Sequence, residues 1–507
     1  MENGRLKILC DLIPTGDIQR DKIIIPKILE LTKSQHEKNV NDMKRLVDYY
    51  FNKTNILLKE KTQQSSINNK VAIDYPQIAV TTINAYCFAN PLSFSSRNPA
   101  KELQMKSFND AIDDDNYSEK AMKMYFNAGT TGLGYRYIMP ASAEQIEDGI
   151  YFESNCDLDP QKTYCVYSND LKQEKICAIS YYERKFYDES LRTKQTTTIY
   201  NVWTKYHKWE FYKKSGAWVN ATYTITDADE NIQILEAYPL PYRKIPVVEN
   251  LRKVDRTGDY ELALDLIDAI NALASSRLDD VEQAVDYVIL LRDIDTESEG
   301  ALERVKDAIK QGILSFKSIQ GATVQPEIKV LDTKLNQAEV QTLQDFLCAK
   351  LEEVLNIPNR ETRSSGGDTG SAVESRNGFR SLENIAGIVT NNAKKTENES
   401  LDVILAICKN IPSCPFKDLL PRDIEIKENR NRVENMNSAS TSYATLISAG
   451  MNDEDALIAT RIVPDPASTA KKNKIAQEEK DKREMAKQKL TKQSQNNIGS
   501  DSKNADE

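Results

Sequence analysis

The chain has 507 residues, of which 40% are hydrophobic and 28% charged, and its formal net charge is −10. This balance is typical of a soluble globular protein, and a net acidic surface disfavours collecting nucleic acid by bulk attraction. Only two histidines occur, which excludes a histidine-rich metal site, and no apolar stretch approaches the ~20 residues that cross a membrane. The eight cysteines have no CxxC spacing, so we expect reduced, buried thiols, as in the cytosol.

The first half of the chain predicts helices followed by a sheet. Residues 22–60 and 68–94 carry apolar residues at helical spacing, and a further helix is expected from about Tyr117 to Asn127. From Tyr135 to Val248, aromatic and β-branched residues alternate with polar ones between turn residues, which predicts an antiparallel sheet of several strands. We therefore expect an α+β fold.

The segment from Gly258 to Leu291 predicts one long amphipathic helix, roughly 45 Å in length at 1.5 Å per residue. Its apolar face consists of Leu266, Ile267, Ile270, Leu273, Ala274, Leu278, Val281, Val285 and Val288. The opposite face carries an acidic stripe made of Asp265, Asp268, Asp279, Glu282 and Asp286. Such a stripe is either the solvated face of an ordinary helix, or it belongs to a subunit that packs beside its neighbours around a molecule that it must not bind.

The second half predicts a small α/β module after this helix, then a second amphipathic helix from Asn336 to Ile357. A glycine- and serine-rich loop follows Pro358, and loops of this kind between two helices are often functional. A helix resumes near Ala372 and extends to about Asn410. Residues 436–462 predict two short helices with Asn452 as an N-cap. The charged segment from Pro464 onward predicts a disordered or partly helical tail.

Few patterns suggest enzyme chemistry. The chain has no Walker A, GxSxG or HExxH motif, and two acidic runs, 227–231 and 293–297, lack the glycine of a calcium loop. Asp423, Glu425 and Lys427 alternate as in the metal site of a nuclease. The same alternation is what any half-buried strand shows, and this second interpretation is favoured.

The order and wording of the segments from about residue 22 to 465 resemble the portal proteins of tailed bacteriophages, in the branch found in long-tailed phages of Gram-positive hosts. The stretches that carry the resemblance are NNKVAIDYPQIAVTTINAYCFANPLSF, LPYRKIPVVENLRKVDRTGDYELALDLIDAINALASSRLDDVE, VLNIPNRETRSSGGDTGSAVESR and SAGMNDEDALI. In the third stretch, Asp368-Thr369-Gly370-Ser371-Ala372 departs slightly from the family's loop.

The resemblance implies a portal fold and a ring, usually of twelve identical subunits, with neither an active site nor a cofactor. Its parts would be a wing (1–256), a stem helix (257–291), a clip (292–333), a second stem helix (334–357), a tunnel loop (358–371), a long helix with a wing return strand (372–432), a crown (433–465) and a disordered charged tail (466–507).

The resemblance also implies partners. The ring would sit at one capsid vertex of the virion, after assembly in the host cytoplasm, beside the major capsid protein and, where one exists, a scaffold protein. Double-stranded DNA would be packaged through the channel by the terminase large subunit and later ejected, with a head-completion adaptor docking at the clip and no membrane involved. The tunnel loop would touch DNA through Arg360, Arg363, Ser364, Ser365, Gly366, Gly367, Asp368, Thr369 and Gly370.

Within that frame the acidic stripe would line the channel and let phosphates slide past, or would pair with basic residues of a neighbouring subunit. Two other interpretations stay open on the sequence. In the first, the chain is another virion structural adaptor with a similar helix-rich layout. In the second, it is a metal-dependent nuclease that uses Glu425 and Lys427.

Overall fold

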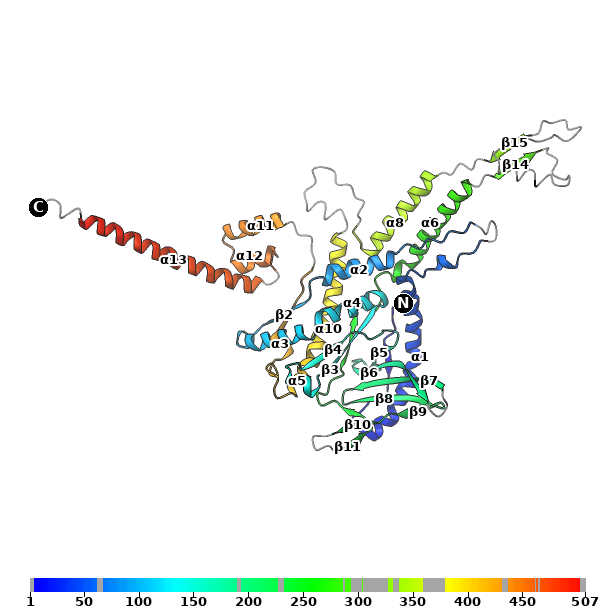
Figure 1. The fold of residues 1–507 in the computed structure, drawn as a ribbon, viewed down its shortest axis with the longest axis horizontal. Helices are drawn as coiled ribbons and strands as arrows, with labels where there is room; N and C mark the ends of the chain where they lie inside the picture. Colours follow the sequence, from blue (N-terminus) through cyan, green and yellow to red (C-terminus); the bar gives the residue numbers. More distant parts are fainter. Residues whose placement is uncertain are drawn as a thin grey trace, which may run out of the picture. The chain divides into compact units, whose positions relative to one another are not determined.

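The computed structural model describes residues 4–61, 67–188, 193–226, 232–285, 288–292, 303, 327–331, 337–358, 379–430, 436–460, 462–463 and 466–501. The chain divides into two compact units. Unit 1 comprises Met1–Gly367 and Ser371–Glu428, and unit 2 comprises Asp368–Gly370 and Asn429–Glu507. Helices and strands are mixed along unit 1 (Figure 1), so the predicted α+β class is confirmed.

Unit 1 contains seven helices longer than one or two turns, if only its described residues are counted. Their bounds are α1 (Ile18–Tyr50), α2 (Tyr75–Phe88), α3 (Glu102–Asp114), α4 (Tyr117–Thr131), α6 (Leu264–Val285), α8 (Gln337–Leu355) and α10 (Phe379–Lys409). Shorter helical segments are α5 (Ala143–Glu147), η1 (Asn55–Leu58), η2 (Pro99–Lys101), η3 (Glu261–Ala263) and η4 (Pro421–Asp423).

The largest sheet has seven strands, in the order β1-β5-β6-β7-β8-β12 with β9 beside β8. These are β1 (Ile8–Cys10), β5 (Thr163–Ser168), β6 (Lys175–Asp188), β7 (Thr193–Thr204), β8 (His207–Lys214), β9 (Ala217–Asn220) and β12 (Tyr238–Pro239). All pairs are antiparallel except β1, which lies parallel to β5. The antiparallel sheet predicted from the alternating segments is therefore confirmed, and the parallel edge strand from the N-terminus is an addition.

Four smaller sheets complete the described strands. A three-stranded sheet has the order β13-β3-β4, from β3 (Leu133–Pro140), β4 (Phe152–Asn155) and β13 (Val247–Leu251). Three two-stranded pairs are formed by β2 (Ser93–Ser96) with β16 (Ile424–Lys427), β10 (Tyr223–Thr226) with β11 (Ile232–Leu235), and β14 (Val288–Arg292) with β15 (Glu327–Leu331).

The core of unit 1 has several centres. One face of α1 buries Ile25, Ile28 and Leu29 against Trp209 and Phe211 of the large sheet. Another cluster joins α10 to the three-stranded sheet, and a third holds the base of α6 and α8 against α1 and α2. All eight cysteines are free and seven are buried, as predicted; burial raises the pKa of Cys165 to about 12, so that thiol stays protonated.

The helix predicted from Gly258 to Leu291 is wrong at both ends. Helix α6 begins at Leu264, after the short η3 turn, and ends at Val285. Val288–Arg292 is instead strand β14, which pairs antiparallel with β15 in the predicted clip. A run of Val, Ile and Leu suits a strand as well as a helix. Here the pairing with β15 favours the strand.

Unit 2 contains a pair of short helices, α11 (Met436–Ser448) and α12 (Asp453–Thr460). Gly450 adopts a φ of +87° where α11 ends, and Asn452 caps α12 by accepting from the backbone N–H of Asp455 at 3.0 Å. The N-cap predicted at Asn452 is thus confirmed.

The sequence predicts a charged tail that is disordered or partly helical. Residues Pro466–Asp501 form one helix, α13. The Lys, Glu, Gln and Ala residues of α13 have high helix propensity. Its apolar residues do not form a stripe along the helix, and Ile475 and Met485 are exposed. The sequence therefore specifies a polar helix here.

Candidate functional site

The two helices α6 and α8 contact one another, and we call this pair the stem (Figure 1). At its base, Leu264, Ile267 and Ile270 of α6 are buried together with Leu351 and Leu355 of α8. Higher up, Arg277 of α6 donates a hydrogen bond of 2.8 Å to Gln341 of α8. The two amphipathic helices predicted from the sequence are therefore both present, as α6 and α8, and they lie against one another.

A buried ion pair fixes where the stem begins. Arg252 is almost fully buried and donates to both carboxylate oxygens of Asp259, at 2.8 and 2.6 Å, and to Asn84 of α2 at 2.8 Å. Backbone packing there is tight, because a Cβ on Gly258 would lie 2.7 Å from the carbonyl oxygen of Thr130. The connector before α6 is thus held rigidly against α2 and α4.

The carboxylates of the predicted acidic stripe on α6 lie in different surroundings. Asp268 accepts hydrogen bonds from Tyr49 at 2.7 Å and Asn55 at 2.8 Å. The side chain of Asp279 is 1% exposed and lies 2.7 Å from both Lys59 and Lys61. Asp265 and Glu282 are exposed, while Asp286 lies outside the described residues.

The groups that occupy this face belong to a segment we call the strap, the described residues 54–61 and 67–73. Three backbone N–H groups of the strap donate to three side chains of α6: Asn69 to Asp279 at 2.7 Å, Val71 to Ser275 at 2.9 Å and Ile73 to Asn271 at 2.9 Å. Alternate residues of an extended chain repeat every ~6.6 Å, and every fourth helix residue repeats every ~6 Å, so the two ladders match.

The charge on Asp279 is stabilised by this arrangement. Burial alone would raise the pKa of the carboxyl, but hydrogen bonds from Lys59, Lys61 and Asn69 outweigh burial and hold the pKa below its ordinary value. The carboxylate therefore serves as a charged acceptor inside the molecule. Sequence reasoning missed the ladder, although Asn271, Ser275 and Asp279 have the i, i+4 spacing that places polar groups on one helix face.

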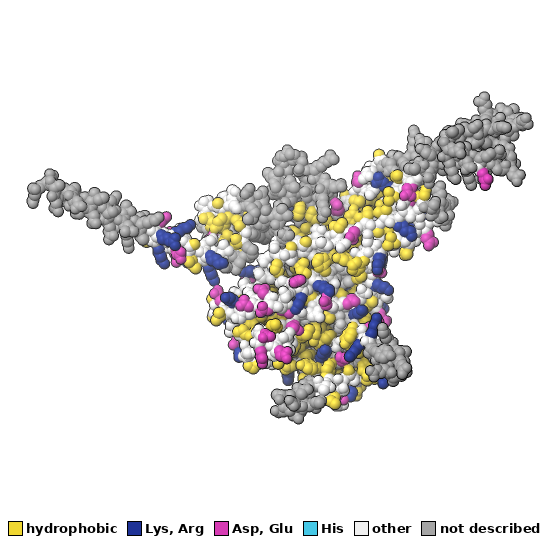
Figure 2. Space-filling model, viewed as in Figure 1, with side chains coloured by type: hydrophobic (Ala, Val, Ile, Leu, Met, Phe, Trp, Pro, Cys, Tyr) yellow, Lys and Arg dark blue, Asp and Glu magenta, His cyan; other side chains and the backbone are white. Residues whose placement is uncertain are grey.

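Large apolar side chains of the stem remain exposed. They gather over α6 and α8 (Figure 2), and they are Leu278 (46% exposed), Val281 (47%), Leu343 (50%), Phe346 (56%) and Val354 (49%). Leu278 and Val281 belong to the apolar face predicted for the helix, and this part of that face is open to solvent. Clustered exposed apolar groups of this kind mark interaction surfaces in soluble proteins.

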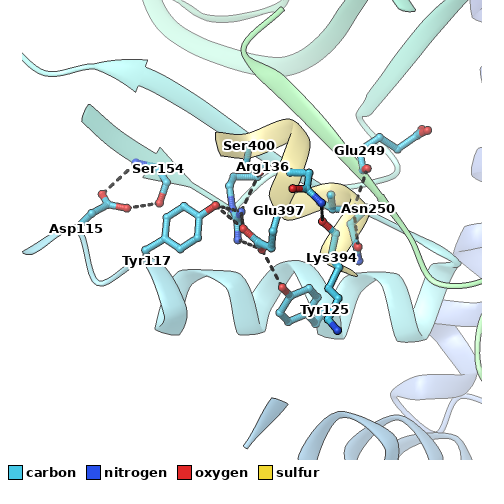
Figure 3. Close-up of polar contacts among 12 residues, drawn as sticks. Asp115, Tyr117, Tyr125, Arg136, Ser154, Glu249, Asn250, Lys394, Glu397 and Ser400 are labelled. Atoms are coloured by element: carbon cyan, nitrogen blue, oxygen red, sulfur yellow. Dashed lines mark hydrogen bonds and ion pairs between the residues drawn. The ribbon is translucent and has the colours of Figure 1, made fainter. Parts of the chain in front are cut away.

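A second buried ion pair anchors α10 (Figure 3). Arg136 of β3 and Glu397 of α10 are both essentially unexposed and form two parallel hydrogen bonds of 2.7 and 2.9 Å. Tyr125 donates to the same carboxylate at 2.9 Å, and Ser400 accepts from Arg136 at 3.0 Å. Removing one partner from such a pair is far more damaging than the net stability the pair contributes.

Apart from Pro358, the predicted tunnel loop lies outside the described residues. Helix α8 ends at Leu355 and α10 begins at Phe379, and residues 359–378 lie outside the described residues. The candidate DNA contacts from Arg360 to Gly370 all fall in this range. The two acidic runs considered as calcium loops, 227–231 and 293–297, also lie outside.

The nuclease interpretation receives no geometric support. Glu425 and Lys427 lie on β16, opposite Ser95 and Ser93 of β2. Asp423 is 2.7 Å from Lys101 and caps the backbone N–H of Leu420, so it is a local structural group. Across the part of the chain that the structure describes, no three His, Cys, Asp or Glu side chains come together as metal ligands.

None of the helices in the described ranges is long and apolar enough to cross a membrane. A family model described as "Phage portal protein, SPP1 Gp6-like" matches residues 29–488. One relative is the portal protein of Bacillus phage SPP1, which is 21% identical over 366 residues, covering 70% of this chain and 68% of that protein. These matches confirm the resemblance seen in the order of segments, and the chain belongs to the family of phage portal proteins.

Proposed function

We propose that this protein forms a ring at one vertex of a phage capsid, and that double-stranded DNA passes through the centre of the ring during packaging and ejection. The observation that carries the proposal is the family match over residues 29–488. Members of this family are structural proteins and not enzymes, so the chemistry of packaging belongs to a separate motor. The geometry of the stem supports the same proposal.

The exposed apolar side chains of the stem fit a contact between neighbouring copies. Leu278, Val281, Leu343, Phe346 and Val354 are each roughly half exposed. Burying the remaining area of each would stabilise the contact by about 1 kcal/mol. The total stabilisation from these side chains must also offset the entropy lost on association, so several such contacts per subunit are needed. A closed ring provides them, because every copy then has two neighbours.

A different face of α6 suits the channel. Asp265, Ala272, Ser276 and Asp280 recur at helical spacing and are all exposed. Small side chains with a few carboxylates offer phosphates no cationic partner and leave room for a duplex. We assign the channel wall to this face, in place of the stripe that contained Asp268 and Asp279. DNA would slide along it, because nothing there binds phosphate.

The remaining partners follow from family membership. The clip, residues 292–333, would dock the terminase large subunit during packaging and the head-completion adaptor afterwards. The major capsid protein, with a scaffold protein where one exists, would surround the ring in the virion. The tunnel loop, residues 358–371, would touch DNA as it advances, with Arg360 and Arg363 brushing phosphates.

The test is the mass and shape of the purified protein. Native mass spectrometry and negative-stain images should show a ring of about a dozen subunits with a central channel. Phe346→Asp combined with Leu343→Asp should give monomers, because a charge would be buried at the contact. The matched control, Phe346→Leu, keeps the apolar surface and should keep the ring. A monomeric wild-type protein at all concentrations and salts would contradict the proposal.

A further inference from the structure

Two of the eight free cysteines lie close together where α10 ends. Cys408 is in the last turn of α10, and Cys414 follows in the turn segment before η4. The backbone N–H of Ile411 donates to the carbonyl of Cys408 at 3.1 Å, and the N–H of Cys414 donates to the carbonyl of Ile411 at 3.2 Å. These two turns fold the chain back, and the thiols of Cys408 and Cys414 are hydrogen-bonded to one another. We call these two residues the dithiol pair.

The surroundings hold the dithiol pair in place. Cys408 and Cys414 are 0% and 2% exposed and belong to the same hydrophobic cluster. Phe416 is fully buried and packs edge-on against Phe108 of α3 and against Tyr151, with ring centroids 5.5 Å apart in each pair. The segment that carries Cys414 is thus fixed to the rest of unit 1, and the two thiols stay neighbours.

Cys414 is the member of the pair that is better placed to react. Its chain neighbours Ser413 and Pro415 are both exposed, so only the turn segment has to open for a reagent to reach it. The hydrogen bond from Cys408 lowers the pKa of Cys414, whereas burial raises the pKa of Cys177 well above its ordinary value. Because the thiolate is the form that attacks a disulfide, Cys414 is the attacking thiol, and the fully buried Cys408 is the second thiol.

We propose that Cys408 and Cys414 form a reversible disulfide site that is oxidised by low-molecular-weight disulfides such as glutathione disulfide. The Cys414 thiolate attacks one sulfur of glutathione disulfide, which leaves a mixed disulfide on Cys414 and releases one glutathione thiolate that takes up a proton. The Cys408 thiol then loses its proton, attacks the Cys414 sulfur and releases the second glutathione, which takes up that proton. The protein loses two hydrogen atoms, and the glutathione disulfide gains them.

The disulfide would tie the end of α10 to the turn segment that Phe416 anchors on α3. Thiols stay reduced in the cytosol, whereas disulfides persist outside cells and on virions. The pair would therefore be reduced while the particle is assembled and oxidised after its release. This timing rests on the proposed function, whereas the chemistry of the pair does not.

Mass spectrometry of the full-length protein after incubation with glutathione disulfide tests the site. Free thiols are alkylated in denaturant before digestion. Cys408 and Cys414 should be recovered in one disulfide-linked product that has lost two hydrogen atoms, and dithiothreitol should restore both thiols. Oxidation of the pair should be at least about tenfold faster than any modification of Cys177. Equal rates at Cys177 and at the pair would mean that the protein unfolds before it reacts, and would overturn the inference.

Cys348 of α8 is the internal control for the reagent. It is partly exposed, and the described residues of the cluster around it include no second cysteine. Cys348 should therefore stop at the mixed disulfide with glutathione. A dithiol pair that remains alkylated while Cys348 carries glutathione would overturn the inference, and so would glutathione that stays on Cys414.

Two variants test the order of the steps. Cys408→Ser should hold the reaction at the mixed disulfide on Cys414, because the second thiol is missing. Cys414→Ser should leave Cys408 unmodified, because that thiol is fully buried. Glutathione on Cys408 in the second variant, with none on Cys414 in the first, would contradict the assigned roles. Ring mass is measured on the same samples, so that a failure of the proposed function is distinguishable from a failure of the disulfide.

Discussion

Two regions of unit 1 differ in which side chains they bury. One is the stem, and the other is the region around α10, which we call the body. In the body, charged groups are buried and paired, as Arg136 is with Glu397 and Arg252 with Asp259. In the stem, apolar groups such as Phe346 and Leu278 are left in water. The first region is complete within one chain, whereas the second leaves apolar surface that the proposed ring would cover. In the proposed ring, each subunit would therefore combine a rigid body with surfaces that are buried on assembly.

The largest effect on stability is expected from breaking the buried pair of the body. Glu397→Gln keeps the shape of the side chain but leaves Arg136 buried without a counter-charge. We expect the free energy of unfolding, measured by denaturant titration on the monomeric stem variant, to fall by about 3–5 kcal/mol. Asp402→Asn, which removes an exposed partner of Lys244, is the matched control and should cost less than about 1 kcal/mol. Similar losses from both changes would contradict the expected difference between the buried pair and the exposed pair.

A smaller effect is expected where the strap joins the stem. Asp279→Asn removes the charge that holds Lys59 and Lys61 while leaving an amide that can still accept from Asn69. We expect a loss of about 1–3 kcal/mol and faster hydrogen exchange in residues 67–73. Asp280→Asn changes the exposed neighbouring carboxylate and should leave strap exchange as it is. Unchanged exchange in Asp279→Asn would rule out the carboxylate as the group that holds the strap.

Acidification should act on the same carboxylate. Since hydrogen bonds outweigh burial and lower the pKa of Asp279 in the folded protein, its stabilising contribution is fully present above the unfolded-state pKa of ~3.9 and is lost as the pH falls toward the folded-state pKa. The difference in unfolding free energy between wild type and Asp279→Asn should be constant at neutral pH and shrink below about pH 4. A difference that grows on acidification would mean that folding raises the pKa of Asp279. That result would contradict its pairing with Lys59 and Lys61.

These regions also show what the sequence could predict. Local signals were sufficient for the alternating strands of the large sheet, the two stem helices and the cap at Asn452. Helix α3 was missed although Met105, Phe108 and Ile112 have helical spacing and are buried. The prediction failed where distant partners decide, because Asp279 is 220 residues from Lys59 and 210 from Asn69. Periodicity identifies two faces of a helix, but it does not say what will lie against each face.

The smallest effect on stability, with a large effect on function, is expected from the loop between α8 and α10. Helix α10 is fixed by Glu397 and by its buried Leu382, Ala386 and Val389, so removing Ser364–Gly370 should leave its anchoring and the ring unchanged. DNA packaging, measured in vitro with the purified motor and empty capsids, should stop if the loop contacts the moving duplex. Glu425→Ala, which alters only the nuclease candidate on β16, is the control and should package normally. Normal packaging without the loop would move the DNA contact to the exposed face of α6, where Asp265 and Asp280 would be the next residues to change.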